Sequence, residues 1–272
     1  MTRSSASPGT ALITGGTQGI GAGCARVFHE RGANVVVCAP DVPGGTAVER
    51  ELDSIRPGSC LFVDCDVRAS DQVAAALAAG TDRFGALDCV INNAGISRVG
   101  KTLVETTRDE IDELIATNLI GVIVVTQFAL PLLRETKGTI VNIGSIAGRI
   151  GHDRAAVYAA TKGAIGALTK SLAIEEASNG VRVNAVLPGN ILTESRRLLE
   201  EASANPQELH DYVESWQWLG RSGLPEEVGR ACYFLASEEA SFITGAELVV
   251  SGGAELGPGP KEHVDFGRRG QS

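Results

Sequence analysis

The chain has 272 residues, of which 43% are hydrophobic and 4% aromatic, and its formal net charge is −9. A chain of this length can bury roughly three quarters of its unfolded surface, so it is large enough for one sizeable α/β domain. The acidic balance and the lack of a basic block argue against a nucleic-acid partner. No apolar run approaches the ~18 residues of a membrane span, and the N-terminal MTRSSASPGT lacks the apolar core of a secretory signal.

The cysteines and histidines carry no ligand pattern. The chain has six cysteines and no C-x-x-C pair, and its four histidines are scattered. Most of the cysteines lie in apolar runs, which is typical of buried free thiols in a reducing compartment. We therefore expect a cytoplasmic protein without disulfides or a metal site.

Short apolar runs alternate with longer helical patterns along the whole chain. The runs predict seven strands, and they are continuously apolar, as expected for strands covered on both faces. Strands are expected at residues 10–14, 34–38, 59–64, 87–92, 138–145, 181–188 and 246–252. Helices are expected at residues 21–32, 70–84, 106–135 with a break near Asn118, 155–179 and 225–237.

This alternation predicts an α/β fold of the Rossmann type, a doubly wound seven-stranded parallel sheet with helices on both faces. No linker divides the chain, so we expect one domain over residues 1–272 with its core at about 9–256. The polar insert at 193–219, which contains Trp216 and Trp218, is expected to form a substrate lid. The segment 257–272 has no periodicity and is expected to be a flexible tail.

A glycine-rich turn follows the first predicted strand. It reads TGGTQGIG over residues 14–21, with Gly15, Gly19 and Gly21 spaced as G-x-x-x-G-x-G. Glycines allow the backbone to approach a pyrophosphate, and the N-terminus of the following helix attracts that anion. A plain tight turn between strand and helix is the alternative. The position of the turn favours a dinucleotide site.

A second glycine-rich stretch fits a different motif. GISRVGKT at residues 95–102 matches the phosphate-binding loop G-x-x-x-x-G-K-[ST] of nucleotide hydrolases. However, it follows the fourth strand instead of the first, and the next strand ends NIGS without an Asp for Mg²⁺. A P-loop hydrolase is therefore the less favoured alternative, and Lys101 is expected to be solvated in a loop.

Tyr158 and Lys162 lie four residues apart in a helix of small residues, VYAATKGAIGAL. Side chains at this spacing share one helix face, and an ammonium group lowers the pKa of a neighbouring phenol. Such a tyrosine can act as a general acid or base near neutral pH. Ser145 ends the fifth strand, at the sheet edge where a site is expected. The residues around it do not form the G-x-S-x-G elbow of a serine hydrolase.

These motifs together resemble the short-chain dehydrogenase/reductase family. The resemblance spans roughly residues 9–256 and rests on TGGTQGIG, NNAG at 92–95, Asn118, Ser145, YAATK at 158–162 and PGNILT at 188–193, in family order and spacing. RFGALDCVINNAG, ALPLLR, PGNI and SGGAELG further resemble dehydrogenases of the 17β-hydroxysteroid dehydrogenase type 14 kind and bacterial sugar or polyol dehydrogenases.

The resemblance implies an NAD(P)-dependent oxidoreductase that interconverts a secondary alcohol and a ketone. Tyr158 would exchange the proton, Lys162 would lower the pKa of Tyr158 and bind the nicotinamide ribose, and Ser145 would hydrogen-bond the substrate oxygen. Asn118 would interrupt its helix and hold a water that links Lys162 to solvent. Residues with an implied role in cofactor binding are Gly15, Thr17, Gln18, Gly19, Ile20, Gly21, Asp41, Asp66, Val67, Asn92, Ala94, Gly95, Tyr158, Lys162, Pro188, Gly189, Ile191 and Thr193.

The end of the second strand, VVVCAPD, departs from the family pattern. NAD enzymes usually carry an acidic residue at about Ala39 to bind the ribose 2′-hydroxyl, and NADP enzymes carry Arg or Lys nearby. This chain has neither, but Asp41 would repel a 2′-phosphate and stands within reach of the ribose. We therefore expect NAD, with NADP as the alternative.

The substrate is expected to be a small alcohol or ketone, such as a sugar, a polyol, a steroid or a similar cyclic alcohol. The residues expected to contact it are Ser97, Ser145, Ile146, His152, Asn190 and Leu192, together with Arg98 and one of the two lid tryptophans. The resemblance also implies a homotetramer, consistent with small residues along the helix after Ala155. A catalytically silent NAD(H)-binding regulator of the same fold is the remaining alternative, and the complete Ser145, Tyr158, Lys162 and Asn118 set argues against it.

Overall fold

The computed structural model describes residues 9–257 and contains one seven-stranded sheet in which all neighbouring strands are parallel. The strand order is β3-β2-β1-β4-β5-β6-β7, so the chain winds outward in both directions from β1. This confirms the predicted doubly wound Rossmann fold. The strands are β1 (Thr10–Thr14), β2 (Asn34–Ala39), β3 (Cys60–Asp64), β4 (Cys89–Asn92), β5 (Thr139–Ile143), β6 (Arg182–Pro188) and β7 (Glu247–Val250).

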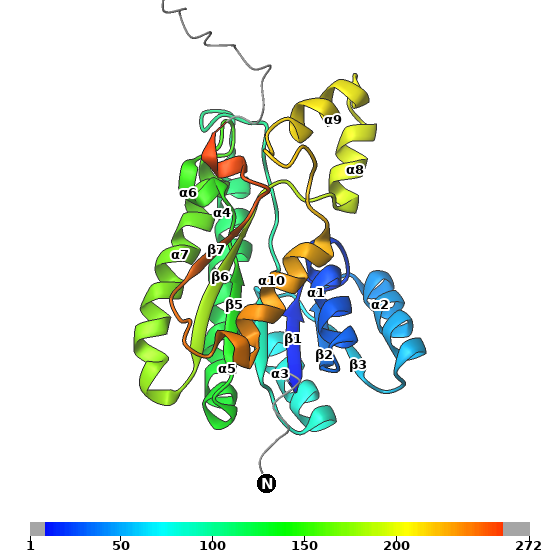
Figure 1. Ribbon diagram of the computed structural model, residues 1–272, viewed down its shortest axis with the longest axis vertical. Coiled ribbons are helices and arrows are strands. Elements are labelled where there is room, and N and C mark those ends of the chain that lie inside the picture. The colour runs from blue at the N-terminus through cyan, green and yellow to red at the C-terminus, as the bar shows by residue number, and fades with distance from the viewer. Residues whose placement is uncertain (1–8, 258–272) are drawn as a thin grey trace, which may run out of the picture.

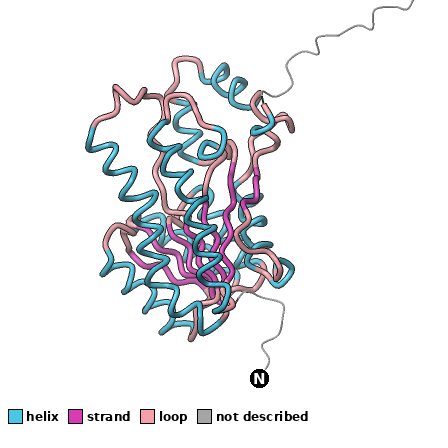
Figure 2. Tube along the Cα trace, turned by 90° about the vertical axis from the view of Figure 1, so that its left-hand side faces the viewer, coloured by secondary structure: helices cyan, strands magenta, loops and turns pink. Residues whose placement is uncertain are grey.

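Helices cover both faces of the sheet (Figures 1 and 2). On one face α1 (Gly19–Glu30), α2 (Val42–Ile55) and α10 (Pro225–Ala236) contact the strands. On the other face lie α3 (Ser70–Phe84), α5 (Gly121–Thr136) and α7 (Ala156–Glu176). The remaining helical elements are α4 (Arg108–Ile115), α6 (Ala147–Ile150), α8 (Glu194–Glu201), α9 (Pro206–Glu214) and short turns at Ala177–Asn179, Glu238–Ala240 and Ala254–Leu256.

The two-sided burial explains why the strands read as unbroken apolar runs. Val35 and Val37 of β2 pack into the cluster that includes α1 and α10, while Val36 and Cys38 pack into the cluster under α3 and α5. Successive side chains of a strand point to opposite faces, so each face needs its own apolar residues. The result is a sheet whose two faces are both covered by apolar side chains.

The long helix before β5 is interrupted near Asn118, as the sequence predicts. α4 passes into a five-residue π-helix at Ala116–Ile120 and then into α5. Such π-turns inside α-helices widen one turn and redirect the side chains within it. Here the widened turn brings the buried side chain of Asn118 toward the loop after β4.

Two features differ from the predicted elements. α2 is absent from the predicted helices because Pro43 and two glycines open it, although Asp41 caps its first turn through the Gly44 N–H. The predicted lid at 193–219 is largely helical, since it holds α8 and α9, which stand above the carboxyl edge of the sheet (Figure 1). Most of the predicted flexible tail, residues 258–272, lies outside the described residues.

Candidate active site

The glycine-rich turn is built around close backbone contacts. The Gly15 N–H donates to the Cys38 carbonyl across 2.7 Å, which ties the end of β1 to β2. Gly15 has a φ of +62°, and a Cβ there would lie 2.9 Å from the Ala94 Cα. A Cβ on Gly21 would lie 2.2 Å from the Gly15 carbonyl oxygen. Only glycine fits at these two positions, so the turn keeps an open backbone surface at the N-terminus of α1, as a pyrophosphate requires.

Asn93 and Thr14 hold the turn in place, although neither is among the predicted site residues. The Asn93 Nδ2 donates to the carbonyls of Thr14 and Gly15 across 2.9 and 3.0 Å. The Thr14 hydroxyl accepts the N–H groups of Asn93 and Ala94. The doubled asparagine of NNAG carries the signal for this role, because the two asparagines alternate across the sheet edge.

The side chain of Asn92 points the other way. It is buried in the core, where its Nδ2 donates to Thr126 Oγ1 and Asn142 Oδ1. The side chain of Asn92 therefore does not line the cofactor groove, contrary to the prediction. Strand alternation gives the reason, because Asn92 is the last residue of β4 and faces α5 and α7.

Thr17, Ala39 and Asp41 meet at the end of β2. The Ala39 side chain is buried, so it offers nothing to a ribose. The Asp41 carboxylate is fixed by the first turn of α2, where its Oδ1 accepts the Gly44 N–H across 3.1 Å. A Cβ on Gly44 would lie 2.1 Å from Asp41 Oδ2 and 3.2 Å from Thr17 Cβ. A carboxylate therefore stands two residues beyond the usual acidic position.

Asp66 and Val67, the predicted adenine contacts, follow β3. The Asp66 carboxylate pairs with Arg68, which holds the pKa of Asp66 below its usual value. Val67 is buried against α5, where a Cβ on Gly121 would lie 2.7 Å from a Val67 methyl group. The negative charge of Asp66 is therefore balanced by Arg68 without any ligand.

Ser145 and Tyr158 are brought together by α6 and α7. Ser145 follows β5, and its Oγ accepts the Ala147 N–H across 3.1 Å at the start of α6. Burial raises the pKa of the Tyr158 phenol. The Ser145 side chain also lies close enough to the Tyr158 phenol to lower its pKa, which opposes that rise. The predicted serine–tyrosine pair is thus formed by residues from two different elements.

Lys162 is buried one turn further along α7, and its Nζ donates to the Ile143 carbonyl of β5 across 2.8 Å. Burial lowers the pKa of Lys162 to about 8. The expected lowering of the Tyr158 pKa by this lysine is not observed, because the amine is bound to Ile143 and does not act on the phenol. In the structure as it stands, desolvation dominates the electrostatics of both groups.

Gly95 lies next to the side chains of both Asn118 and Lys162. A Cβ on Gly95 would lie 3.2 Å from Asn118 Oδ1 and 3.5 Å from Lys162 Nζ. Asn118 Oδ1 accepts the Ile96 N–H, and its Nδ2 donates to the Ile96 carbonyl and to Thr161 Oγ1. The Asn118 side chain therefore fixes the loop after β4 and ties it to α7.

The chain after β6 closes over the glycine-rich turn. Gly189 packs on β7, since a Cβ there would lie 2.8 Å from the Ser251 Cα, and Pro188 accepts the Ile146 N–H. The Ile191 side chain is part of the core. Thr193 caps α8 through the Arg196 N–H, and its methyl group lies 3.1 Å from the position of a Cβ on Gly19. Predicted cofactor residues from distant parts of the sequence thus meet at the start of α1.

The remaining predicted cofactor residues, Gln18 and Ile20, belong to the turn itself. Gln18 is exposed and precedes the first residue of α1, where its carbonyl accepts the Ala22 N–H. The half-buried Ile20 packs against the core. The turn therefore presents one polar side chain outward and anchors itself with an apolar one.

The predicted substrate residues surround the same edge. Ile146 begins α6, His152 lies between α6 and α7, and Leu192 donates its N–H to the Gly223 carbonyl. Asn190 Nδ2 donates to Gln217 Oε1, so the lid is connected to the end of β6. Ser97 is exposed in the loop after β4. His152 and Asn190 contact residues of the lid, and Ser97 does not.

The segment GISRVGKT matches the pattern of a phosphate-binding loop only by chance. Lys101 Nζ pairs with Glu110 of α4 and Arg98 pairs with Glu113, so these loop cations bind the helix that follows them. Within residues 9–257, no group of three His, Cys, Asp or Glu side chains is placed to hold a metal ion. All six cysteines are free and buried.

A doubly wound sheet with a glycine-rich first turn and a Ser–Tyr–Lys set at its carboxyl edge defines a nicotinamide-dependent oxidoreductase. The family model described as enoyl-(acyl carrier protein) reductase, a model of the short-chain dehydrogenase/reductase family, matches residues 15–255. The chain belongs to the short-chain dehydrogenase/reductase family.

Individual relatives agree with this assignment. The chain is 46% identical over 250 residues to L-fucose dehydrogenase from Oryctolagus cuniculus, covering 92% of this chain and 86% of that protein. It is 36% identical over 253 residues to meso-2,3-butanediol dehydrogenase from Serratia marcescens, covering 93% and 97%. The solved structure of the Cj0485 dehydrogenase superposes with a TM-score of 0.86 at 26% identity, covering 92% and 95%. The chain is therefore a dehydrogenase-type oxidoreductase of alcohols and ketones.

Proposed function

We propose that the protein is an NAD-dependent dehydrogenase of a sugar or polyol. The observation that carries the proposal is that α7 packs Tyr158 and the buried Lys162 against the end of β5, where Ser145 acts on the phenol, at the sheet edge that also carries the glycine-rich turn. The relatives named for L-fucose and meso-2,3-butanediol support a polyhydroxylated substrate. The reaction removes a hydride from the carbinol carbon and a proton from its hydroxyl.

The chain's own residues handle the proton. Tyr158 accepts the hydroxyl proton of the alcohol as the carbonyl forms, and Ser145 donates a hydrogen bond to the same oxygen as its charge develops. A bound nicotinamide supplies the hydride acceptor. Lys162 would hold the ribose hydroxyls of the bound nicotinamide, and its ammonium would there stabilise the Tyr158 phenolate.

The preference for NAD rests on Asp41. Its carboxylate is fixed beside Thr17 at the first turn of α2, so a 2′-phosphate would have to approach a negative charge. In NAD the 2′-hydroxyl instead meets a hydrogen-bond acceptor. No lysine or arginine lies among residues 15–21 or 39–45 to favour the phosphate.

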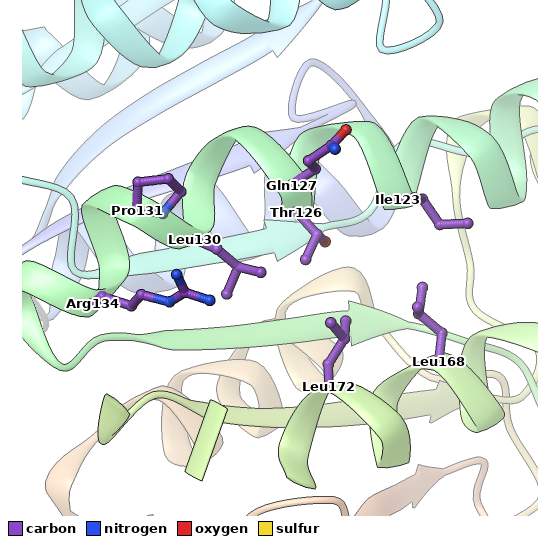
Figure 3. A pocket seen from close by; sticks show the side chains of 8 residues that line it. All are labelled: Ile123, Thr126, Gln127, Leu130, Pro131, Arg134, Leu168 and Leu172. Carbon is purple, nitrogen blue, oxygen red and sulfur yellow. The ribbon is translucent and has the colours of Figure 1, made fainter. Parts of the chain in front are cut away.

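A homotetramer is supported by an apolar groove between α5 and α7. The groove has a volume of about 390 Å³ and lies on the outer side of the two helices (Figure 3). Ile123 and Leu130 of α5 face Leu168 and Leu172 of α7 across it. A second copy of the same pair of helices would fill this surface, since a two-fold axis brings the same patch together.

The groove between α5 and α7 also explains why the long helical segment before β5 is so apolar. Residues Arg108–Thr136 are long and apolar enough to cross a membrane by length and composition, with 39% of the most apolar window buried. Val125, Ala129 and Leu133 are buried in the core below α5, so one side of the helix serves the fold. We infer that the outer side serves contact between subunits in the cytoplasm, where the six free thiols stay reduced.

An activity screen tests the proposed function. The protein is mixed with sugars, polyols and steroids in the presence of NAD or NADP, and formation of the reduced nicotinamide is followed by absorbance. We expect reduction of NAD with a sugar or polyol. Absence of turnover with every alcohol, while NAD still raises the melting temperature, would favour a silent cofactor-binding regulator instead.

A further inference from the structure

Three aromatic rings meet where the lid touches the loop before α7. The rings of His152 and Trp216 are close to parallel, with an interplanar angle of 17° and centroids 6.4 Å apart. Tyr212 of α9 meets Trp216 edge-on at 5.8 Å and 77°. Parallel rings in contact at that centroid distance are offset, so part of the indole face is left uncovered. Trp216 is 38% exposed.

Trp216 is held in place by its neighbours. Gln217 is fully buried, and its Oε1 accepts a hydrogen bond from Asn190 at the end of β6. The Leu219 N–H donates to the Gly252 carbonyl after β7 across 3.1 Å. The Trp216 backbone N–H itself donates to the Val213 carbonyl of α9 across 3.3 Å, so the residue is held from both sides and presents its ring in one orientation, which a binding surface needs.

His152 brings an unused acceptor to the same place. Its Nδ1 lies 2.7 Å from the Asp153 carbonyl, so this nitrogen carries the proton of the neutral ring. Nε2 is then an acceptor, and it has no partner within residues 9–257. His152 lies in the short connection between α6, which follows Ser145, and α7, which carries Tyr158. An apolar face and a polar acceptor thus stand together at the loop that joins the helix after Ser145 to the helix of Tyr158.

We propose that His152 and Trp216 form the specificity surface for a cyclic sugar. The apolar C–H face of a pyranose ring packs on the open part of the Trp216 indole, and a ring hydroxyl donates to His152 Nε2. An acyclic diol has no such flat face and gains little from this surface. The inference rests on the proposed dehydrogenase function and adds the substrate class and the two residues that select it.

The first test compares a cyclic and an acyclic substrate. Trp216→Leu should lower kcat/KM for L-fucose about tenfold or more while changing that for meso-2,3-butanediol less than about twofold. His152→Leu should act in the same direction, and His152→Gln, which keeps an acceptor, should recover part of the loss. Phe242→Leu is the matched control, because Phe242 is a fully exposed ring next to Ile243, which binds Arg182 at the opposite edge of the sheet. Equal losses on both substrates would overturn the proposal.

The second test measures binding without turnover. L-Fucose is titrated into the NAD complex of Tyr158→Phe, with the heat of binding measured by calorimetry as the readout. We expect a saturable change that is lost in Tyr158→Phe/Trp216→Leu and kept in Tyr158→Phe/Phe242→Leu. Failure of the sugar to bind, or unchanged binding without Trp216, would overturn this inference. Failure of the native protein to reduce NAD with any alcohol would instead count against the proposed function.

Discussion

Lys162 Nζ donates to the Ile143 carbonyl across 2.8 Å, although Tyr158 lies one turn away on the same helix. The amine is thus held by the end of β5 and is buried there, which lowers its pKa to about 8. Because the ammonium group is buried at the sheet edge, it lowers the free energy of unfolding. Ligand hydroxyls that reach Lys162 would offset that loss of stability.

Replacement of Lys162 by methionine should stabilise the free protein at neutral pH. The pKa of Lys162 falls from 10.5 to about 8 on folding, so the unfolded chain binds more protons between these values and the penalty is complete below about pH 8. At about 1.4 kcal/mol per pKa unit the penalty is on the order of 3 kcal/mol. Loss of the bond to Ile143 costs about 1 kcal/mol, so the net gain is about 2 kcal/mol.

Denaturant unfolding of the ligand-free protein between pH 7 and pH 10.5 checks this prediction. The gain from Lys162→Met should shrink as the pH rises and turn into a small loss near pH 10.5. Lys170→Met on the same helix is the control, because Lys170 is exposed and pairs with Glu247 at the surface. A pH-independent difference for Lys162→Met would contradict the buried, charged state of Lys162.

Tyr158→Phe should separate chemistry from binding. Loss of the phenol removes the group that takes the proton, so we expect kcat to fall by about 10²–10⁴. The affinity for NAD, measured by calorimetry, should change little, because the glycine-rich turn and Thr193 remain. A variant with a near-normal rate would defeat the role assigned to Tyr158.

The charge at Asp41 should set the choice of cofactor. We expect NAD to raise the melting temperature of the protein more than NADP does. Asp41→Asn keeps a side-chain cap for α2 but removes the negative charge, so the ratio of NAD to NADP affinity should narrow about tenfold. Asp71→Asn on α3 tests for a general effect of charge, and it should leave the ratio unchanged. A larger shift with NADP in the native protein would reverse the assignment.

A charge in the groove between α5 and α7 should disrupt self-association. Ile123 lines the groove and is partly exposed, so Ile123→Glu would place an unpaired carboxylate in the interface. We expect a reduced molar mass in light scattering coupled to gel filtration. Val104→Glu is the control, because Val104 is 97% exposed in the loop before α4. The same molar mass for Ile123→Glu and the native protein would place the interface elsewhere.

The sequence was sufficient for the strands and for most of the helices around them. Residues of β1 and α3 coincide with the predicted ranges, because each element is bounded by turn residues and has one clear apolar period. α2 was not predictable in this way, since its first turn carries Pro43 and two glycines and only the Asp41 cap marks it. The helices of the lid are polar, so no apolar period marks them in the sequence.

The candidate site also has one part that the sequence predicts and another that depends on the tertiary structure. The spacing of Tyr158 and Lys162 on one helix, and the position of Ser145 at a strand end, follow from local periodicity, so the sequence alone was enough to predict the residues of the proposed catalytic set. Only the tertiary structure decided what their side chains contact: Asn92 turns into the core, Asn93 binds the glycine-rich turn, and Lys162 binds Ile143. These contacts join strands and helices far apart in the chain. Hydrogen-bond partners and burial depend on that packing, which no local pattern of residues contains.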